Sequence, residues 1–493
     1  MVFTSPRFFV FILIVLLGIT AIPSREWKKR FLMAASCFFY AAWDWRYLGL
    51  LLFISVIDYI AASKIAETDH PRIRKAWLVL SVVSNLGVLA YFKYCNFFID
   101  NFNLLLGGGG LHIEALKILL PVGISFYTFK TMSYTIDVYR NEIEPCRKWL
   151  DYATFITFFP ELVAGPIVRG SVFLPQMNRM IGLEKGRFVV GSSIFVQGLI
   201  KKLLIADRVS KVADPVFASP ELFHSVTIWF GVLAYTIQIY CDFSGYSDMA
   251  IGIAKIIGYD LPENFNMPYW SANITEFWRR WHITLSSWLR DYLYIPLGGN
   301  RHGPRQTYLN LMLTMLLGGL WHGASWNFVL WGGLHGGALA IHKFCRSGQT
   351  GGSAWGAACA HLGTLMFVVL TWVPFRSQSF QNSILIYKKL FVIGTPEGGR
   401  WYPEWLFWCS ALLVIGHVIG INVEGIVRLG RPGGRLKKLL DRLGFRVDVL
   451  PIAGPYIVPE RITVGSVYVM SLLLIALFLF SPFSTNPFIY FQF

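Results

Sequence analysis

Charged side chains are scarce in this sequence. Asp, Glu, Lys and Arg together make up 15% of its 493 residues, whereas apolar residues make up 55%. A soluble domain of this length would have too little polar surface to cover so large an apolar fraction. The composition therefore excludes an ordinary soluble globule and indicates a chain that lies largely in a lipid bilayer.

Several common functional motifs are also missing. The seven cysteines form neither a CxxC pair nor a Cys/His cluster with zinc spacing, so we expect free thiols and no metal site. There is no P-loop and no GxGxxG at the start of a helix, and the glycines at 107–110 indicate a flexible connection. The net charge of +16 comes without any nucleic-acid-binding motif. The excess charge therefore fits loops that face anionic lipid, and we expect no nucleic-acid partner.

Apolar runs recur along the whole chain. Several reach the roughly 20 residues that cross a bilayer as a helix. Two runs are interrupted, 152–167 by a proline and a glutamate and 31–62 by the residues 43–46, which indicates bent or re-entrant elements that line a protein-enclosed cavity. We predict an all-α polytopic membrane protein with roughly 11 membrane-embedded helices, forming a single domain over residues 1–493.

Charge also predicts how the chain is placed. The first run, Phe8 to Ile22, is followed by four basic residues between Arg25 and Arg30. The positive-inside tendency puts the N-terminus outside the cytoplasm, and the run is expected to be retained rather than removed as a signal peptide.

Two polar segments interrupt the apolar pattern. In the first, at about 259–305, aromatic side chains recur with helical spacing and predict one amphipathic helix at the membrane interface: Trp278, Trp281, Leu285, Trp288 and Tyr292. The second, at about 428–446, is basic with one apolar stripe. It indicates a cytoplasmic amphipathic segment that touches anionic lipid.

His322 is the strongest candidate for chemistry. It lies in LGGLWHGASWNF, residues 318–329, within a span from Gln306 to His342 that has no Asp, Glu, Lys or Arg. An ionisable side chain in such a span is costly and tends to mark a function. The glycines at 318, 319 and 323 would allow close backbone approach and a narrow passage to the imidazole. A structural role, in which His322 bonds a carbonyl in a small-residue helix interface, explains these residues equally well.

Other polar side chains are weaker candidates. His282 lies in WRRWH, where adjacent arginines would favour its neutral form if they are close, although it could equally be an interfacial residue that binds water. For His335 and His342 we favour a structural role. Asp242 and Asp248 lack the ligand density of a calcium loop. We expect Asp242 to cap a helix or to pair with an arginine of the 279–290 block.

Three long motifs together resemble a known family. They are DFSGYSDMAIGIAKIIGYDLPENFNMPYW, EFWRRWHITLSSWLRDYLYIPLGGNR and LLGGLWHGASWNFVLWGGLHG. They are similar to the membrane-bound O-acyltransferase (MBOAT) family, in particular to its bacterial alginate O-acetyltransferase branch, with a motif core at about 240–345. Further segments extend the resemblance from the N-terminus to about Arg376, with Lys130 standing where a glutamine is expected.

The resemblance implies a fold and a chemistry. The fold is a ring of tilted helices around a central tunnel, in which a cytoplasmic acyl donor meets an acceptor from the opposite face. His322 and His282 match the family's two catalytic histidines. His322 would be the base that takes the hydroxyl proton, and Trp321, a protonated His282 or glycine backbone amides would stabilise the oxyanion. No Ser or Cys nucleophile stands out, so direct transfer is favoured, with an acyl-histidine as the alternative.

The expected function is passage of an acetyl group across the bacterial inner membrane. The donor would be acetyl-CoA or an acyl carrier thioester, with no bound cofactor. The acceptor would be an extracellular polysaccharide, with alginate as the expected polymer, or a periplasmic protein that relays the acetyl group. The alternatives are an acyltransferase for cellulose, peptidoglycan or teichoic acid, a transporter or export subunit in which histidines relay protons, or a structural subunit.

Overall fold

The computed structural model describes residues 1–106, 112–179, 182–345, 354–392, 398–428, 434–450, 454–459 and 488. The glycines at 107–110 lie outside these ranges. By its internal contacts the chain forms two compact units, one of residues 1–195 with 249–262 and one of residues 196–248 with 263–493. Each unit is described by itself below.

The first unit consists of helices. They are α1 (Pro6–Ala21), α2 (Arg25–Ala41), α3 (Trp45–Ala66), α4 (Pro71–Leu89), α5 (Cys95–Leu106), α6 (Ile124–Tyr139), α7 (Trp149–Thr157), α8 (Phe159–Leu162), α9 (Gly170–Phe173) and most of α10 (Lys185–Leu199). A π-helical segment, Ala90–Tyr94, joins α4 to α5, and a 3₁₀ turn, Leu174–Asn178, follows α9.

The second unit is also mainly helical. It contains the π-helical segment Ile200–Ala206, α11 (Asp207–Ala218), most of α12 (Ser225–Ile257), α13 (Ile274–Arg280), α14 (Ile283–Leu289), α15 (Gly303–His322), α16 (Trp326–Cys345), α17 (Ala354–Arg376), α18 (Phe380–Phe391), α19 (Trp405–Arg428) and α20 (Gly434–Leu443). Short 3₁₀ turns lie at Pro220–Leu222 and Pro268–Trp270, and a π-helical segment at Arg290–Tyr294 follows α14.

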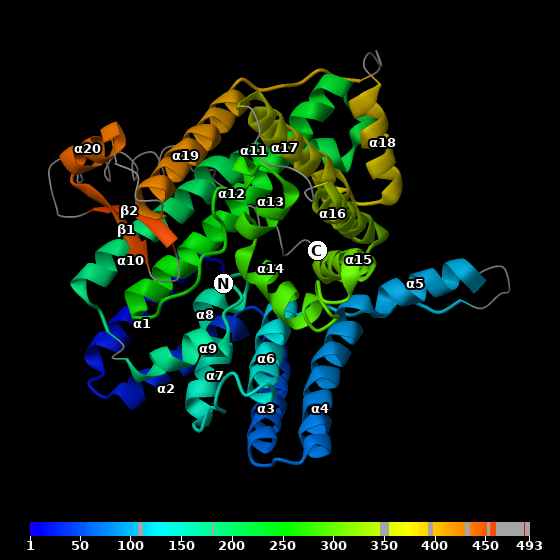
Figure 1. Ribbon diagram of the computed structural model, residues 1–493. Helices are drawn as coiled ribbons and strands as arrows, with labels where there is room; N and C mark the ends of the chain where they lie inside the picture. The colour runs from blue at the N-terminus through cyan, green and yellow to red at the C-terminus, as the bar shows by residue number, and fades with distance from the viewer. Residues whose placement is uncertain are drawn as a thin grey trace. The chain divides into compact units, whose positions relative to one another are not determined.

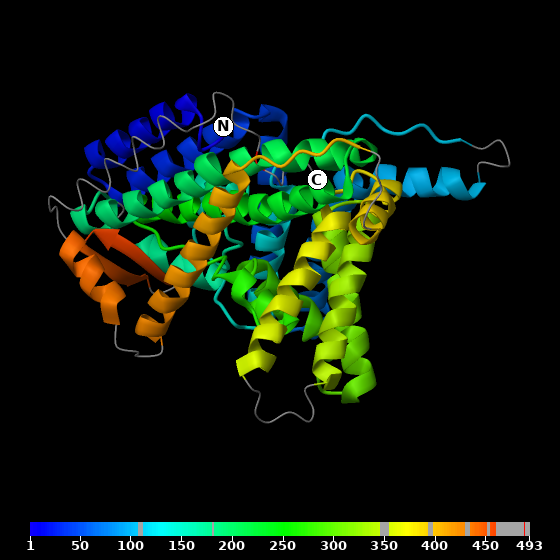
Figure 2. The same cartoon turned by 90° about the horizontal axis from the view of Figure 1, so that it is seen from above.

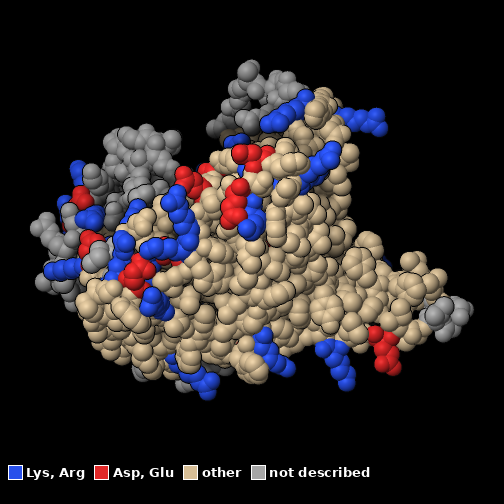
Figure 3. All heavy atoms as spheres, turned by 90° about the horizontal axis from the view of Figure 1, so that it is seen from below, with Lys and Arg blue, Asp and Glu red and all other residues tan. Residues whose placement is uncertain are grey.

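The predicted all-α membrane architecture is confirmed. Among the residues that the structure describes, five helical segments are long and apolar enough to cross a bilayer: Trp45–Ala66, Pro71–Leu106, Lys185–Ala218, Ser225–Ile257 and Trp355–Arg376. Most of the surface drawn in Figure 3 belongs to residues other than Lys, Arg, Asp and Glu. The sequence analysis missed one hairpin, in which β1 (Phe445–Leu450) pairs antiparallel with β2 (Gly454–Pro459). The amphipathic segment predicted at 428–446 contains α20, which leads into this hairpin.

The two predicted interruptions are present. α2 ends at Ala41, and α3 begins after Asp44, whose carboxylate accepts a hydrogen bond from the Arg46 amide at 3.0 Å. This cap satisfies one of the unpaired amides at the start of α3. The helix α7 ends at Thr157 before α8 begins at Phe159, and residues 152–166 are buried throughout.

A buried polar cluster joins α3, α4 and α6, which run side by side in Figure 1. The Asp58 carboxylate accepts hydrogen bonds from Ser81 Oγ at 2.5 Å and from Asn85 Nδ2 at 2.8 Å. Thr131 Oγ1 in turn donates to Asn85 Oδ1 at 2.8 Å. Because polar groups in an apolar environment must be paired, this network fixes how the three helices pack.

Lys130 has a structural role that the sequence did not indicate. Its ammonium pairs with the Glu161 carboxylate of α8 and donates to the Phe155 carbonyl oxygen. Both side chains of the pair are buried, with 6% and 1% of their surface exposed. The pair anchors the short buried helices α7 and α8 to α6.

Glycines let helices approach closely in the second unit. A Cβ atom at Gly319 of α15 would collide with the Phe328 carbonyl oxygen, and one at Gly332 of α16 would collide with that of Met315. The helices α15 and α16 therefore pack backbone to backbone, and they lie side by side with α17 in Figure 2.

Candidate active site

His322 is the last residue of α15, where the chain leaves the helix at Gly323. Its side chain is buried, and its ring is surrounded by three others. The centroid of the His322 ring lies 5.0 Å from that of Trp321, 5.1 Å from that of Trp331 and 5.1 Å from that of Phe375. This edge-to-face packing fixes the orientation of the imidazole in an apolar environment.

The neighbouring glycines serve packing rather than a passage, contrary to the sequence-based expectation. The space beside Gly319 is filled by the backbone of α16, and the space beside Gly323 by the Phe328 ring. A Cβ atom at Gly318 would lie 3.1 Å from Leu289 Cδ1. The close approach that glycine allows is therefore used between helices α15 and α16 and brings the aromatic rings of α16 to the end of α15.

His282 lies at a break between two short helices, so the predicted single helix is wrong. α13 ends at Arg280, α14 begins at Ile283, and His282 itself adopts the left-handed conformation with φ of +43°. The loop before α13 compensates for the break, because the Asn264 carbonyl oxygen accepts a hydrogen bond from the Ile283 amide at 2.9 Å. A left-handed non-glycine residue costs about 1–3 kcal/mol, and such strain clusters at functional sites.

The aromatic side chains of this segment are buried in the protein rather than exposed at the membrane interface. Trp278, Trp281 and Trp288 expose 8%, 1% and 7% of their surface. The expected interfacial helix is therefore wrong for these rings. They turn inward because the break at His282 gives α13 and α14 separate axes, each with its own apolar face.

Asn264 determines which nitrogen of His282 carries the proton. His282 is fully buried, and its Nδ1 lies 3.1 Å from Asn264 Oδ1. The amide oxygen is identified by its other contacts, since it also accepts from Thr284 Oγ1 at 2.9 Å while Asn264 Nδ2 donates to Ser247 Oγ at 3.2 Å. An amide oxygen only accepts, so Nδ1 of His282 donates and Nε2 is the unprotonated nitrogen of the neutral ring.

The arginines next to His282 are engaged elsewhere. Arg280 bonds Glu276 Oε1 at 3.0 Å and the Asn266 carbonyl oxygen at 3.2 Å, and Arg279 lines a separate cavity. The ring of His282 instead packs edge to face against Phe243 at 4.7 Å. The surroundings of His282 are therefore defined by buried apolar packing and not by the expected repulsion from adjacent arginines.

Trp321 joins the two histidines. Its ring centroid lies 6.1 Å from that of His282 and 5.0 Å from that of His322. The structure thus brings together all three site residues predicted from the sequence, although they come from different elements. The positioning residue Asn264 was missed, and its only sequence signal was its place in the motif DLPENFN.

The other two histidines of this region have structural contacts. His335 is fully buried, with Nε2 3.0 Å from Thr371 Oγ1 and its ring 4.7 Å from that of Trp331. Nδ1 of His342 lies 2.9 Å from Thr275 Oγ1. These contacts agree with the structural role expected for both.

A cavity of about 820 Å³ lies within the second unit, and Ile283, the residue after His282, is part of its lining. Its walls are largely apolar, with Trp278 and Met315 among the lining residues, and it also carries the basic residues Arg279, Arg290 and Lys343. Met315 precedes His322 by seven residues on α15, about 10 Å along the helix.

Two tryptophans connect this cavity to His322. The Trp278 ring lies 5.7 Å from that of Trp331, which in turn lies 5.1 Å from the His322 ring. Nε1 of Trp278 and Nε1 of Trp331 are buried, and neither has a hydrogen-bond partner within the part of the chain that the structure describes. Buried donors of this kind are positioned to bind a polar group of a ligand.

Asp242 and Asp248 have lysine partners. Lys202 bonds both Asp242 and Asp207 at 2.8 Å, and Lys201 bonds Asp248 at 2.7 Å. The expected pairing of Asp242 with an arginine of 279–290 is therefore wrong, since the π-helical segment after α10 supplies the cation. Over the described ranges, no group of three or more His, Cys, Asp or Glu side chains is arranged to hold a metal ion.

Comparison with known proteins identifies the class to which this fold and site belong. The sequence pattern of the "MBOAT, membrane-bound O-acyltransferase family" matches residues 147–350. The chain belongs to this family, and it is an O-acyltransferase.

Individual relatives cover most of the chain. It is 44% identical to a protein of Azotobacter vinelandii named as a probable alginate O-acetylase, over 80% of this chain and 79% of the relative. A protein of Pseudomonas aeruginosa with the same name is 44% identical over 80% of this chain and 76% of the relative. A peptidoglycan O-acetyltransferase of Helicobacter pylori is 39% identical over 79% of each chain. These similarities confirm the predicted family and its alginate branch.

Proposed function

We propose that the protein transfers an acetyl group from a cytoplasmic thioester to a hydroxyl group of an extracellular polysaccharide, with alginate as the polymer. The observation that carries the proposal is the joint placement of His282 and His322 around Trp321 beside a large cavity. The names of the alginate O-acetylase relatives support the choice of polymer. A peptidoglycan acceptor is the second candidate, favoured by the Helicobacter pylori relative.

In this proposal His322 is the general base. Its imidazole takes the proton of the acceptor hydroxyl as the oxygen attacks the thioester carbonyl. The tetrahedral intermediate then collapses, the carbon–sulfur bond breaks, and the imidazolium returns the proton to the leaving thiolate. Oxygen gains the acetyl group, sulfur gains the proton, and the histidine ends neutral. No acyl-enzyme is required.

Trp321 and His282 have different roles. The oxyanion needs a hydrogen-bond donor, and the Trp321 indole N–H, between the two imidazoles, is the side chain we assign to it. Nε2 of a neutral His282 carries no proton and cannot donate a hydrogen bond. We therefore favour Trp321 over a protonated His282 as the oxyanion donor. We assign His282 Nε2 to orient the acceptor sugar by accepting a hydrogen bond from a second hydroxyl of that sugar, because the proton of the attacking hydroxyl goes to His322.

The cavity is the proposed donor site. Its apolar part fits an extended thioester arm, and the buried indole N–H group of Trp278, a lining residue, can bind an amide oxygen of that arm. Arg279, Arg290 and Lys343 suit the phosphates of coenzyme A or of a carrier protein. By the positive-inside tendency, these basic residues favour a cavity that opens toward the cytoplasm. The membrane would be the bacterial inner membrane. A periplasmic protein that completes the transfer is the proposed partner.

The test compares two buried histidines. Cells whose only copy carries His322→Ala are expected to lose polymer acetylation, whereas His335→Gln, a change in the same helix pair, is expected to retain it. Membrane abundance and thermal stability of each variant are matched to wild type. Retained acetylation in His322→Ala at equal abundance would show that His322 only packs and would remove the centre of the proposed mechanism.

A further inference from the structure

One face of α1 is apolar and exposed. Val10, Leu13, Ile14 and Leu17 expose 60%, 57%, 57% and 61% of their surface and follow the i, i+3, i+4, i+7 spacing of a single helix face. In a membrane protein such a strip contacts lipid acyl chains. Thr20 continues the same face one turn further toward the end of the helix.

A basic pocket begins where this strip ends. It has a volume of about 480 Å³ and lies within the first unit. Thr20 contributes to its wall, together with Lys28 of α2 and with Arg179 and Arg187 on either side of the start of α10. Lys28 is buried, with 8% of its surface exposed, and Glu184 is the acidic residue of the lining.

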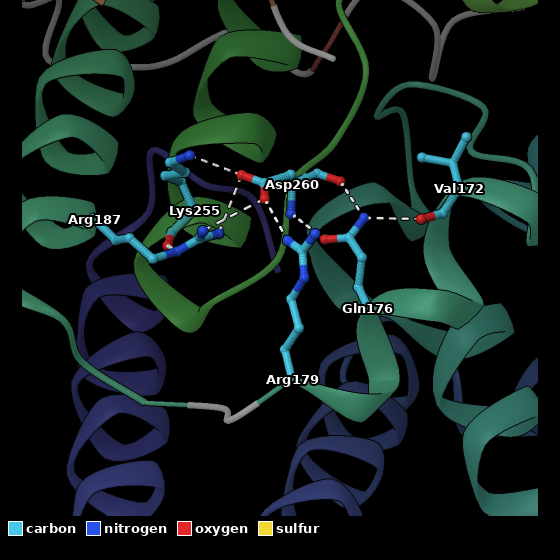
Figure 4. Close-up of polar contacts among 6 residues, drawn as sticks. All are labelled: Val172, Gln176, Arg179, Arg187, Lys255 and Asp260. Carbon is cyan, nitrogen blue, oxygen red and sulfur yellow. Dashed lines mark hydrogen bonds and ion pairs between the residues drawn. The ribbon is translucent and has the colours of Figure 1, made fainter. Parts of the chain in front are cut away.

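Asp260 holds the basic side chains together, as Figure 4 shows. Its carboxylate bonds Arg179 at 3.0 Å, Arg187 at 3.1 Å and Lys255 at 2.8 Å. Its amide donates to Gln176 Oε1 at 2.8 Å, which fixes the backbone. Burial raises the pKa of Asp260, but the Lys255 hydrogen bond and the charges of Arg187 and Lys255 outweigh it, so the pKa lies below its usual value.

The charges at this site do not balance. Lys28, Arg179, Arg187 and Lys255 supply four positive charges, and Asp260 and Glu184 supply two negative ones, which leaves an excess of two within the pocket and the adjoining cluster. Partly buried cations attract an anion that can accept several charge-assisted hydrogen bonds. A phosphate group has this chemistry.

We propose that the pocket binds the phosphate headgroup of an anionic phospholipid whose acyl chain lies along the exposed strip of α1. The pocket supplies the charge, and the strip of Val10, Leu13, Ile14 and Leu17 supplies the apolar surface, so the two features together match both ends of one lipid. A basic pocket between membrane helices at headgroup depth is a recurrent form of anionic lipid site. Coenzyme A also carries phosphates, but it has no acyl chain that would lie along the strip.

The experiment measures lipid retention by the purified full-length protein in detergent with native mass spectrometry. Phosphatidylglycerol is titrated against phosphatidylethanolamine of identical acyl chains. Wild type is expected to retain phosphatidylglycerol at concentrations where phosphatidylethanolamine is lost. Arg179→Gln is expected to weaken retention about fivefold, and Lys28→Gln with Arg179→Gln about 25-fold, from about fivefold per positive charge.

Three controls separate the possible explanations. Arg72→Gln removes an exposed arginine from α4 of the same unit and is expected to leave retention unchanged. Arg179→Lys keeps the charge and is expected to restore most of the binding. Excess coenzyme A is expected not to displace the lipid. The proposal is overturned if the two lipids bind equally, if Arg72→Gln has the same effect as Arg179→Gln, or if coenzyme A displaces phosphatidylglycerol. Because the side chain of Arg179 is 59% exposed, the single variant tests the site without a large cost in folding.

Discussion

Replacing Asn264 by alanine tests whether the tautomer of His282 matters. The Asn264 side chain accepts the Nδ1 proton of His282 at 3.1 Å and a hydrogen bond from the Thr284 amide at 3.3 Å, whereas the bond from the Ile283 amide to the Asn264 carbonyl oxygen is kept in the substitution. In Asn264→Ala the Nδ1 proton loses this acceptor in a fully buried site. The ring then gains by moving the proton to Nε2, the nitrogen that we assign to a second hydroxyl of the acceptor sugar.

The magnitude follows from the cost of that lost hydrogen bond. An unsatisfied buried donor costs about 1–3 kcal/mol, which corresponds to a factor of about 5–150 in the ratio of the two tautomers. Removing a residue that orients a metal-ligating histidine typically changes activity about 10–100-fold, and we apply the same range to His282. We therefore expect kcat to fall about 10–100-fold in Asn264→Ala, with the KM for the donor unchanged.

The assay is the initial rate of acetyl incorporation into polymer by membranes that contain equal amounts of each variant, over a range of donor concentrations. Thr284→Val is the matched control, since Thr284 bonds the same Asn264 oxygen at 2.9 Å and its loss leaves the His282 contact in place. A kcat for Asn264→Ala within twofold of wild type would refute the reasoning. An equal loss in Thr284→Val would show that the loop, rather than the tautomer, controls the rate.

Three further outcomes are expected from the packing and the cavity. Lys130→Met leaves the Glu161 charge buried without its partner and should destabilise the protein by about 3–5 kcal/mol. Lys130→Met combined with Glu161→Leu should destabilise it much less. Thermal unfolding in detergent compares the two variants, and equal losses of stability would contradict the buried pair. Gly332→Ala should destabilise the protein by about 1–3 kcal/mol, because its Cβ would meet the backbone of α15, while Gly333→Ala, with its nearest neighbour at 3.7 Å, should be neutral in the same measurement. Arg279→Gln should raise the KM for a coenzyme A thioester several-fold with little change in kcat, and an unchanged KM would place the donor outside the cavity.

Much of the fold is encoded in local sequence. Scarce charge and long apolar runs are enough to predict membrane helices, because only a helix satisfies its own backbone hydrogen bonds in lipid. The residues at 43–46 predicted an interruption of the apolar run, and in the structure Asp44 caps the helix α3 that follows it. The β1–β2 hairpin was missed although apolar and polar residues alternate from Phe445 to Val449, because the start of β1 was interpreted as part of the basic amphipathic segment at 428–446.

The candidate site divides in the same way. His322 stood out because an ionisable residue in an uncharged span is rare, and His282 and Trp321 lay in motifs long enough to be recognised. The sequence by itself thus determined a membrane O-acyltransferase and predicted the three side chains of the candidate site.

Only the tertiary structure decided how those side chains are held. The left-handed break at His282 depends on main-chain bonds to Asn264, a residue 18 positions away whose role no local pattern reveals. The partner of Asp242 is a lysine because the segment after α10 packs there, and the glycines around His322 face the α16 backbone, the Phe328 ring and Leu289 rather than a passage. Each of these features rests on contacts between residues distant in sequence, and helical periodicity specifies which face of a helix is apolar without specifying what that face meets.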